Sequence, residues 1–599
     1  MRHRSALARV TLAGALFSLI LHAPVAHSEI SLPTPREHYQ NYDPRVAALA
    51  LFTGLMVELD PETRTRIGSA VAAGAPSLET FADEELMEVL TTLDWMKWRS
   101  QILELLLHAS SALEVTPSSA KKWLPAVHDS LLLFLDRLPE ERLAERLLEL
   151  ARMPREASRG DRLLAFVSRT PTLQKLGQIL ARHPDVEPEL GRALQTLENS
   201  LATASRQEVV GAIERELGRD VLEEYRFRFA DNVLAEASVG AVIQVRFLRP
   251  GEEAWQQAVC KVLKPYAVSG IKEELAALDE ILAFLEEHGE FYELGATPLV
   301  EMFEEVRAAL SREILVEEEQ RNLARAASYY GNRDDIVIPK IYPFSTPGVT
   351  CMEYVEGEKI TDAFPEDPEA RSRLARKFND IMTFDVIFSP QEEALFHGDP
   401  HPGNIFHVLD GEENPYRIAL LDWGLLGVFP REQRAKLVQL LVGLYLGDVK
   451  RLSNNVDSLF EGDASQGLDE ESRRALVREV LERRNGQNAF EILNALVAKL
   501  ARQGYRLRFN TVVFIKSQVT IYGLLKELDP EIERDDYLMD RLSGQVYREL
   551  PKRLLRTVWF PAWNSHDYRS MLSNEDVKDI QVKRTARAVK KLGRAVWRG

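Results

Sequence analysis

The sequence predicts an α+β protein built from a small sheet lobe and a larger helical lobe. Alternating apolar runs that are typical of strands lie at 241–248 and 257–263, and further strand-like runs lie within 336–355. Apolar residues at helical spacing dominate 368–550. Strands first and helices later along the chain is the pattern of an α+β fold.

Several segments are expected along the 599 residues, because a chain of this length is too long for one hydrophobic core. They are a leader (1–28), a helical N-terminal region (29–155), a helical extension (165–230), a sheet lobe (231–357), a helical lobe (358–550) and a basic tail (551–599). The composition, 45% hydrophobic and 28% charged, is that of an ordinary globular protein. The formal net charge of −17 argues against nucleic acid as a partner.

The leader has the features of a targeting segment. Three arginines precede an apolar run at 10–21, and Ala26 and Ser28 fit a small-x-small cleavage site. The apolar run is short for a membrane span. The leader can therefore be interpreted in three ways: as an export signal, as an uncleaved membrane anchor or as a buried helix. A signal or anchor implies membrane association, with the side of the membrane undetermined.

Three helices are predicted in the N-terminal region, at 47–59, 83–100 and 131–153, where apolar residues recur every three or four positions. We interpret this region as a helical scaffold. A docking or regulatory domain is the alternative.

One lysine stands out in the predicted sheet. Lys261 lies in the middle of the second strand, where a lone charge among apolar residues is costly unless it is paired. The candidate partner is Glu319, on the helical stretch 270–330. Glu317 and Glu318 beside it fit the spacing equally well. An edge-strand lysine and a solvated acidic helix face are the alternative.

The two cysteines, Cys260 and Cys351, both lie in predicted strands. Two cysteines are too few for a disulfide framework or a zinc site, so each is interpreted as a small buried apolar residue. The twelve histidines show no spacing typical of a metal site.

The most informative pattern is His-Gly-Asp-Pro-His-Pro-Gly-Asn at 397–404, followed by Asp-Trp-Gly at 422–424. It places the carboxylate of Asp399, the amide of Asn404 and the carboxylate of Asp422 in the order that phosphoryl transfer on a kinase-like fold requires. Asp399 is predicted to orient the hydroxyl group that accepts the phosphate. The other two are predicted to hold Mg²⁺ against the phosphates of ATP. A polar loop without chemistry is the alternative.

The segment between the two motifs is predicted to form a hairpin, with a strand, a turn and a strand at 404–409, 410–414 and 417–421. The second strand ends at Asp422. His397 and His401 flank Asp399, and we expect them to hold the backbone of the loop rather than bind a metal.

The other parts of an ATP site are predicted upstream. Lys261 is expected to clamp the phosphates and Glu319 to hold that lysine in place. Small residues before the first strand let backbone N–H groups approach phosphates, or simply turn a corner; they are Ala235, Ala237, Ser238 and Gly240. A strand and glycine at 350–357 have the form of an adenine-binding hinge, in which Glu353 and Val355 offer backbone groups.

These motifs resemble those of the UbiB-like (AarF/UbiB) atypical kinases, a family linked to ubiquinone and other isoprenoid-quinone lipids. The resemblance covers roughly 170–448. Lys175-Leu-Gly-Gln178 resembles the KxGQ motif of the family, and Arg182-His-Pro-Asp185 follows it like the RPD of the family. The segments 235–240 and 313–322 resemble its alanine-rich loop and its ExD segment.

The resemblance implies ATPase or small-molecule kinase activity rather than ordinary protein kinase activity. In the family the KxGQ segment packs over the active site, pairs with the ExD acids and restricts access to the phosphates. This role falls here to Lys175, Gln178 and Glu313. The sequence departs from the pattern twice, since the third ExD position is Leu315 and the residue after the alanine-rich loop is Ala241. Both changes remove polar groups near the phosphates.

The leading hypothesis is an enzyme, an ATP- and Mg²⁺-dependent UbiB-like kinase or ATPase that acts in or supports isoprenoid-quinone metabolism. Small-molecule phosphotransferases of the aminoglycoside or choline kinase type resemble the same HGD and DWG segments but lack a KxGQ extension. A non-catalytic pseudokinase that binds a lipid or a partner is the third hypothesis. Leu315 and the export-like leader motivate it, because an exported domain has no obvious supply of ATP.

The basic tail suggests a membrane partner. Seven lysines and arginines and no acidic residue lie between Lys583 and Arg598, with apolar residues at helical spacing. A basic amphipathic helix can lie on an anionic bilayer. A membrane surface is therefore a candidate partner beside an isoprenoid lipid, with a solvated tail as the alternative.

Overall fold

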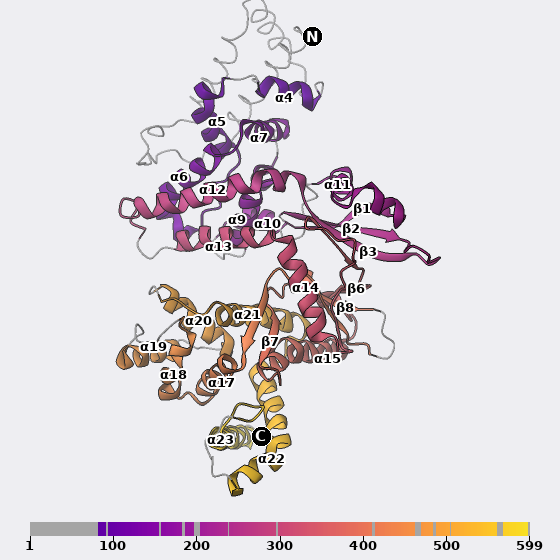
Figure 1. Cartoon of the computed structure of the whole chain (residues 1–599). Helices are drawn as coiled ribbons and strands as arrows, with labels where there is room; N and C mark the ends of the chain where they lie inside the picture. Colours follow the sequence, from indigo (N-terminus) through magenta and orange to yellow (C-terminus); the bar gives the residue numbers. More distant parts are fainter. Residues whose placement is uncertain are drawn as a thin grey trace, which may run out of the picture. The chain divides into compact units, whose positions relative to one another are not determined.

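The computed structural model describes residues 82–596, apart from 92–93, 155–156, 182–185, 197–203, 238, 295–297, 410–413, 462–468, 483–486, 503–504 and 560–566. The leader and the predicted helix 47–59 lie outside the described residues. The chain folds into two compact units, whose helices and strands are labelled in Figure 1. The first unit contains residues up to Leu315 and Phe344–Cys351, and the second contains Val316–Pro343 and residues from Met352 onward.

The first unit contains a group of helices whose apolar faces share one hydrophobic core. They are α4 (Asp83–Thr91), α5 (Trp95–Ala109), α6 (Leu124–Asp136), α7 (Glu140–Arg152), α8 (Arg159–Val167), α9 (Pro171–Ala181), α10 (Pro188–Gln195), α12 (Pro265–Glu287) and α13 (Pro298–Glu313). A further helix, α11 (Arg206–Glu224), leads into the sheet and begins at a capping box in which Ser205 and Glu208 satisfy each other's backbone N–H groups.

Two helices predicted as continuous are each broken. The segment 83–100 is divided between α4 and α5, because Asp94 caps α5 by accepting a hydrogen bond from the Lys97 N–H. The segment 131–153 is divided between α6 and α7, where Pro139 directly precedes α7. A proline has no backbone N–H and cannot continue the preceding helix. The helical character of both segments is confirmed.

A four-stranded sheet completes the first unit, in the order β1-β2-β3-β5. Its strands are β1 (Arg228–Glu236), β2 (Gly240–Phe247), β3 (Gln256–Leu263) and β5 (Val349–Glu353), the last of which ends in the second unit. The predicted strands correspond to β2, β3 and β5. The edge strand β1 was not predicted, because its apolar residues are exposed or half-buried and its sequence lacks a clear apolar alternation.

The two cysteines form a disulfide, Cys260–Cys351, which joins the neighbouring strands β3 and β5. Their interpretation as small buried residues is correct about burial, since both are fully buried. It is wrong about pairing. The 91 residues that separate the cysteines hid the bond, because only the order of strands in the sheet makes them neighbours.

The second unit contains two smaller sheets and a second hydrophobic core. One sheet has the order β4-β9-β8-β6 and the other pairs β7 with β10. The strands are β4 (Ile336–Val337), β6 (Gly357–Lys359), β7 (Glu393–His397), β8 (Ile405–Val408), β9 (Ile418–Leu420) and β10 (Leu426–Pro430). The predicted hairpin strands are confirmed as β8 and β9, which pair antiparallel.

Helices make up most of the second unit. They are α14 (Val316–Tyr330), α15 (Pro368–Asn379), α16 (Asp385–Ile387), α17 (Arg431–Leu446), α18 (Val449–Asn455), α19 (Glu470–Glu482), α20 (Ala489–Arg502), α21 (Phe509–Leu528), α22 (Arg534–Trp559) and α23 (Asn574–Val596). The predicted α+β class is therefore confirmed, and the region predicted as a tail contains the end of α22 and the whole of α23. None of the helices in the described ranges combines the length and apolar character that a bilayer crossing needs.

Candidate functional site

The β8–β9 hairpin places Asn404 and Asp422 at the same end of a sheet. Ile405 lies opposite Leu420, and the Leu421 N–H donates a hydrogen bond of 2.8 Å to the Asn404 carbonyl. Asp422 is the next residue along the chain. The hairpin therefore brings the backbones of Asn404 and Asp422 to the same end, and amide and carboxylate oxygens are ligands of the kind that Mg²⁺ prefers.

His397 connects the loop that carries Asp399 to the same end of the hairpin. The ring is buried at the end of β7, where its Nε2–H donates to the Leu421 carbonyl over 2.8 Å. Its Nδ1 accepts a hydrogen bond of 3.2 Å from the Asp399 backbone N–H. A ring nitrogen that accepts requires a neutral imidazole, and burial lowers the pKa of His397 accordingly. The expected backbone-holding role of this histidine is confirmed.

The polar groups of the loop from Asp399 to Asn404 bond to one another. The Asn404 side-chain amide donates to the Asp399 carbonyl over 3.2 Å, so its Oδ1 is the atom that can bind a metal. The His401 Nδ1 accepts a hydrogen bond of 3.0 Å from the Gly403 N–H, which confirms a backbone-holding role there too. The Asp399 side chain is 61% exposed, so an incoming hydroxyl group can reach its carboxylate.

The backbone of Asp422 is strained. Its φ angle is +35°, in the left-handed region that residues with side chains rarely adopt, and its Oδ1 accepts a hydrogen bond of 3.1 Å from the Gly424 N–H. Trp423 is fully buried, and its indole N–H donates to the Leu420 carbonyl over 3.1 Å. Strain of this size persists only where the surroundings hold it, and it clusters at functional sites.

Helix α14 supports this segment. The Asn322 side-chain amide donates to the Trp423 carbonyl over 3.1 Å, and the Tyr330 hydroxyl donates to the Leu395 carbonyl in β7 over 2.9 Å. Sequence reasoning named Asn322 only as the end of a motif and did not single out Tyr330. Glu319 lies on the same helix and is buried.

In the first unit, the alanine-rich loop makes a tight turn between β1 and β2. The Ala237 N–H donates to the Gly240 carbonyl, and the Lys264 N–H donates to the Val239 carbonyl, each over 2.8 Å. A Cβ atom at Gly240 would lie 3.7 Å from the Cε of Lys261. The loop and the predicted phosphate clamp are therefore neighbours. Ala235 is exposed on β1 and Ala241 is buried, whereas Ser238 lies outside the described residues.

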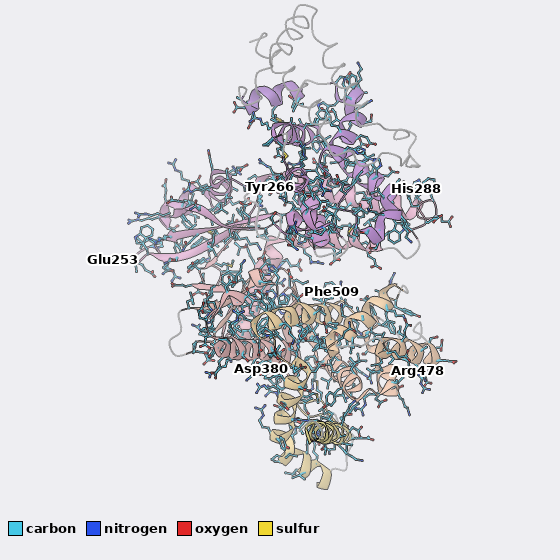
Figure 2. All side chains as sticks on the ribbon, turned by 180° about the vertical axis from the view of Figure 1, so that it is seen from behind. Glu253, Tyr266, His288, Asp380, Arg478 and Phe509 are labelled. Carbon is cyan, nitrogen blue, oxygen red and sulfur yellow. A yellow bond between two sulfur atoms is a disulfide. The ribbon has the colours of Figure 1, made fainter. Side chains whose placement is uncertain are left out.

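A buried ion pair that sequence reasoning missed lies beside this loop. The Lys264 ammonium is 2.8 Å from the carboxylate of Glu236, and both side chains are almost completely buried. Tyr266, labelled in Figure 2, has its ring 5.8 Å from the same ammonium. The pair ties the last residue of β1 to the end of β3. No sequence signal pointed to it, because a lysine before a proline looks like a surface turn.

The contact that the KxGQ resemblance implies is present in the first unit. The Lys175 ammonium on α9 lies 2.5 Å from Glu313 Oε1 on α13, with each side chain about one quarter exposed. Gln178 is partly exposed one turn further along α9. Leu315, the departure from the ExD pattern, is 46% exposed. The RPD-like segment at 182–185 lies outside the described residues.

Two predicted parts of the ATP site stay predictions. Lys261 belongs to the first unit and Glu319 to the second, and each unit is described by itself. In the predicted hinge, the Glu353 N–H donates to the Lys340 carbonyl over 2.9 Å. The Glu353 carbonyl and the Val355 N–H are then the complementary backbone groups that an adenine edge would need.

Comparisons with known proteins show what the chain is similar to. Residues 196–456 match the ABC1 atypical kinase-like domain. The chain is 26% identical over 406 residues to a probable protein kinase UbiB of Glaesserella parasuis, covering 65% of this chain and 72% of that protein. It is also 26% identical over 446 residues to a probable protein kinase UbiB of Azotobacter vinelandii, covering 69% and 81%.

Two further similarities cover a smaller share of this chain. The chain is 26% identical over 299 residues to the chloroplastic protein Activity of BC1 Complex Kinase 3 of Arabidopsis thaliana, of which it spans 40%. A solved structure, the complex of Rv3197 with erythromycin from Mycobacterium tuberculosis, has 18% identity and a TM-score of 0.39, with 59% of this chain and 87% of that chain covered.

The match of residues 196–456 to the ABC1 atypical kinase-like domain, which contains the β8–β9 hairpin and the loop of Asp399, defines an atypical kinase-like protein. The predicted kinase-like fold is confirmed. Within that class, the chain is similar to proteins named UbiB, in line with the resemblance of its KxGQ and ExD segments.

Proposed function

We propose that this protein binds ATP with Mg²⁺ and transfers or hydrolyses its terminal phosphate, in support of isoprenoid-quinone lipid metabolism. The observation that carries the proposal is the hairpin that brings Asn404 and Asp422 to one end, bridged by His397 to the loop of Asp399. The amide oxygen and the carboxylate fit a hard divalent cation. The bound ion would neutralise charge on the phosphates.

The other residues of the site have separate roles in this proposal. Asp399 accepts the proton of the attacking hydroxyl group or water, and its exposure supports that role. Lys261 holds the phosphates beside the backbone N–H groups of the alanine-rich loop, and Glu319 positions that lysine. Glu353 and Val355 bind the adenine edge. Lys175, Gln178 and Glu313 limit access to the phosphates.

The lipid and membrane parts of the proposal rest on the family and on the two ends of the chain. Relatives with 26% identity carry the name UbiB. The basic stretch begins on α23, where Arg584 pairs with Asp540 over 2.6 Å. We propose that the residues beyond Arg584 contact an anionic membrane surface. The Cys260–Cys351 disulfide supports an oxidising compartment, in agreement with an export signal or anchor.

The same disulfide favours a second candidate function, a non-catalytic kinase-like module that binds nucleotide or lipid without turnover. Oxidising compartments are extracytoplasmic in most organisms, and the leader motivates the same hypothesis. One experiment separates the two.

We expect ATP with Mg²⁺ to stabilise the full chain against heat, and ATP with EDTA to do so much less. A ligand at 100 times its Kd adds about 2.7 kcal/mol of stability, which differential scanning fluorimetry detects. Phosphate release is measured in parallel with anionic vesicles that contain or lack an isoprenoid quinone. Metal-dependent stabilisation without turnover would favour the binding module. Stabilisation that EDTA leaves unchanged would contradict the metal site, and equal turnover on both vesicles would contradict the quinone link.

We expect Lys175→Met to raise ATP turnover several-fold, because the proposed role of its pair with Glu313 is to restrict access to the phosphates. The melting temperature should hardly change, since partly exposed ion pairs contribute about 0–1 kcal/mol. Lys272→Met, at an exposed position of α12, is the matched control and should leave turnover unchanged. Turnover that stays at the wild-type level in Lys175→Met would remove this role from the KxGQ segment.

A further inference from the structure

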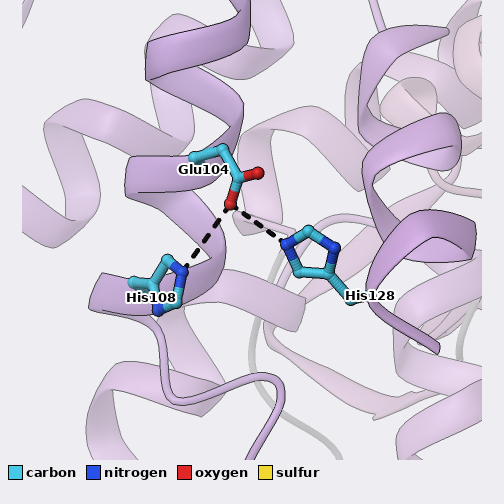
Figure 3. Close-up of side chains that lie close together, drawn as sticks. All are labelled: Glu104, His108 and His128. Atoms are coloured by element: carbon cyan, nitrogen blue, oxygen red, sulfur yellow. Dashed lines mark hydrogen bonds and ion pairs between the residues drawn. The ribbon is translucent and has the colours of Figure 1, made fainter. Parts of the chain in front are cut away.

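A cluster of metal-ligand side chains lies in the N-terminal helices, outside the ABC1 domain. Glu104 and His108 are one helical turn apart on α5, and His128 lies on α6 (Figure 3). The ligand atoms of the three residues lie within 4.8 Å of one another. Within the part of the chain that the structure describes, no other group of three His, Cys, Asp or Glu residues is so placed.

The distances in this cluster suit a tetrahedral ion. Glu104 Oε2 lies 3.1 Å from His128 Nε2 and 3.6 Å from His108 Nε2. Two ligands bound to Zn²⁺ at about 2.0–2.1 Å and a tetrahedral angle are separated by about 3.3–3.4 Å. The two measured separations lie on either side of that value, so small side-chain rotations would seat an ion between all three atoms.

Outer contacts hold His128 in the orientation of a metal ligand. Its Nδ1 is 3.0 Å from Asp129 Oδ1, and the Tyr292 hydroxyl donates to Asp129 Oδ2 over 2.5 Å. Histidine ligands commonly donate their second ring N–H to a carboxylate in this way, which fixes the tautomer and directs Nε2 to the metal.

Burial and charge favour the binding of a cation at this cluster. Glu104 and Asp129 are each 1% exposed, and two buried carboxylates need positive charge nearby. The Oε1 atom of Glu104 is buried and has no hydrogen-bond partner. Native proteins seldom leave such an atom unsatisfied, and a metal ion or a water bound to it would satisfy it. The His108 side chain is 33% exposed, so an ion can reach the cluster from solvent.

We propose that Glu104, His108 and His128 bind a divalent transition-metal ion, with Zn²⁺ as the best fit. Two imidazoles and one carboxylate form a ligand set that zinc uses with a water in the fourth position. Imidazole ligands disfavour Mg²⁺ and Ca²⁺. The ion would crosslink α5 to α6, while Asp129 and Tyr292 act as positioning residues.

The alternative to a bound metal ion is protonation of His128. Burial alone lowers the pKa of His128, but hydrogen bonds to Asp129 and Glu104 outweigh burial and raise the pKa to about 9. A protonated His128 could therefore satisfy the two carboxylates without a metal. A protonated His128 would leave Glu104 Oε1 without a partner. A water in the fourth position of an ion bound to Oε2 could donate a hydrogen bond to Oε1.

The test is titration of the full chain, stripped with EDTA and dialysed, with Zn²⁺ alone in isothermal calorimetry. A parallel titration with Co²⁺ follows the visible absorption of a tetrahedral site. We expect one ion per chain, bound at least tenfold more weakly by His108→Asn. Tyr292→Phe should weaken binding by about 10–100-fold, as removal of an outer-shell partner does.

His288→Asn is the matched control, because this partly exposed histidine of the first unit contacts the Phe284 carbonyl and lies outside the cluster (Figure 2). Its Zn²⁺ affinity should equal that of the wild type. Hydrogen exchange should slow in α5 and α6 when Zn²⁺ is added, which confirms the place of binding. Absence of stoichiometric binding, or equal affinity in His108→Asn, would overturn the proposal in favour of a buried proton or an ion elsewhere.

Discussion

Asp422→Asn is expected to lower ATP turnover by about 10²-fold or more and to abolish the part of thermal stabilisation by ATP that requires Mg²⁺. The substitution removes one negative charge at the proposed metal ligand. The amide oxygen can still accept the hydrogen bond of 3.1 Å from the Gly424 N–H. Asparagine also tolerates the left-handed backbone of this position better than most residues. The variant should therefore melt like the wild type without nucleotide.

The matched control for this variant is Asp362→Asn, which removes one carboxylate charge at an exposed position of the same unit. It should leave turnover and nucleotide stabilisation unchanged. If Asp422→Asn kept full Mg²⁺-dependent stabilisation, the metal assignment would fail. If it lost turnover but kept that stabilisation, Asp422 would act on the reaction rather than on the ion.

Replacing both cysteines with alanine is expected to destabilise the first unit by about 4–5 kcal/mol, the loop-closure value for a crosslink of roughly 90–100 residues. The bond joins residues 91 positions apart and lies directly beside Lys261. Hydrogen exchange of the β2 and β3 amides measures the free energy of opening of this sheet. Lys261 should lose part of its order, so the affinity for ATP should fall as well.

A reducing agent supplies the internal control for the disulfide. It should bring the wild type to the stability of the Cys260→Ala/Cys351→Ala variant and leave that variant unchanged. Thiol titration of the denatured, unreduced protein should find no free thiol among the two cysteines. Two free thiols per chain, with equal stability of both proteins, would contradict a crosslink in the native protein.

The sequence was most informative where chemistry is local. Asp399, Asn404 and Asp422 lie within one short stretch, and a hairpin with alternating apolar residues joins Asn404 to Asp422, so the pairing of the two strands could be predicted. Lys175 and Glu313 are 138 residues apart in the sequence. Their pairing could be predicted only from the family resemblance. Spacing alone describes both residues equally well as exposed helix positions.

Other features depended on packing that a single sequence does not display. The disulfide follows from the strand order β3-β5, and the Glu104, His108 and His128 cluster follows from the packing of α5 against α6. Strand β1 pairs as an edge strand whose apolar residues are exposed or half-buried, so its apolar pattern was too weak to predict. The helix breaks at Asp94 and Pro139 show that local capping and backbone chemistry overrode a continuous apolar period.

The order in which the chain leaves the ribosome matters for this protein. The first unit includes Phe344–Cys351. The ribosome makes this segment only after Val316–Pro343, which belongs to the second unit. At about 5–20 residues per second, Cys260 waits roughly 5–20 seconds for its partner. During that interval β3 lacks its neighbour β5 and exposes an unpaired edge. An exposed strand edge can pair with another chain, so this interval is when the nascent protein is most prone to aggregate.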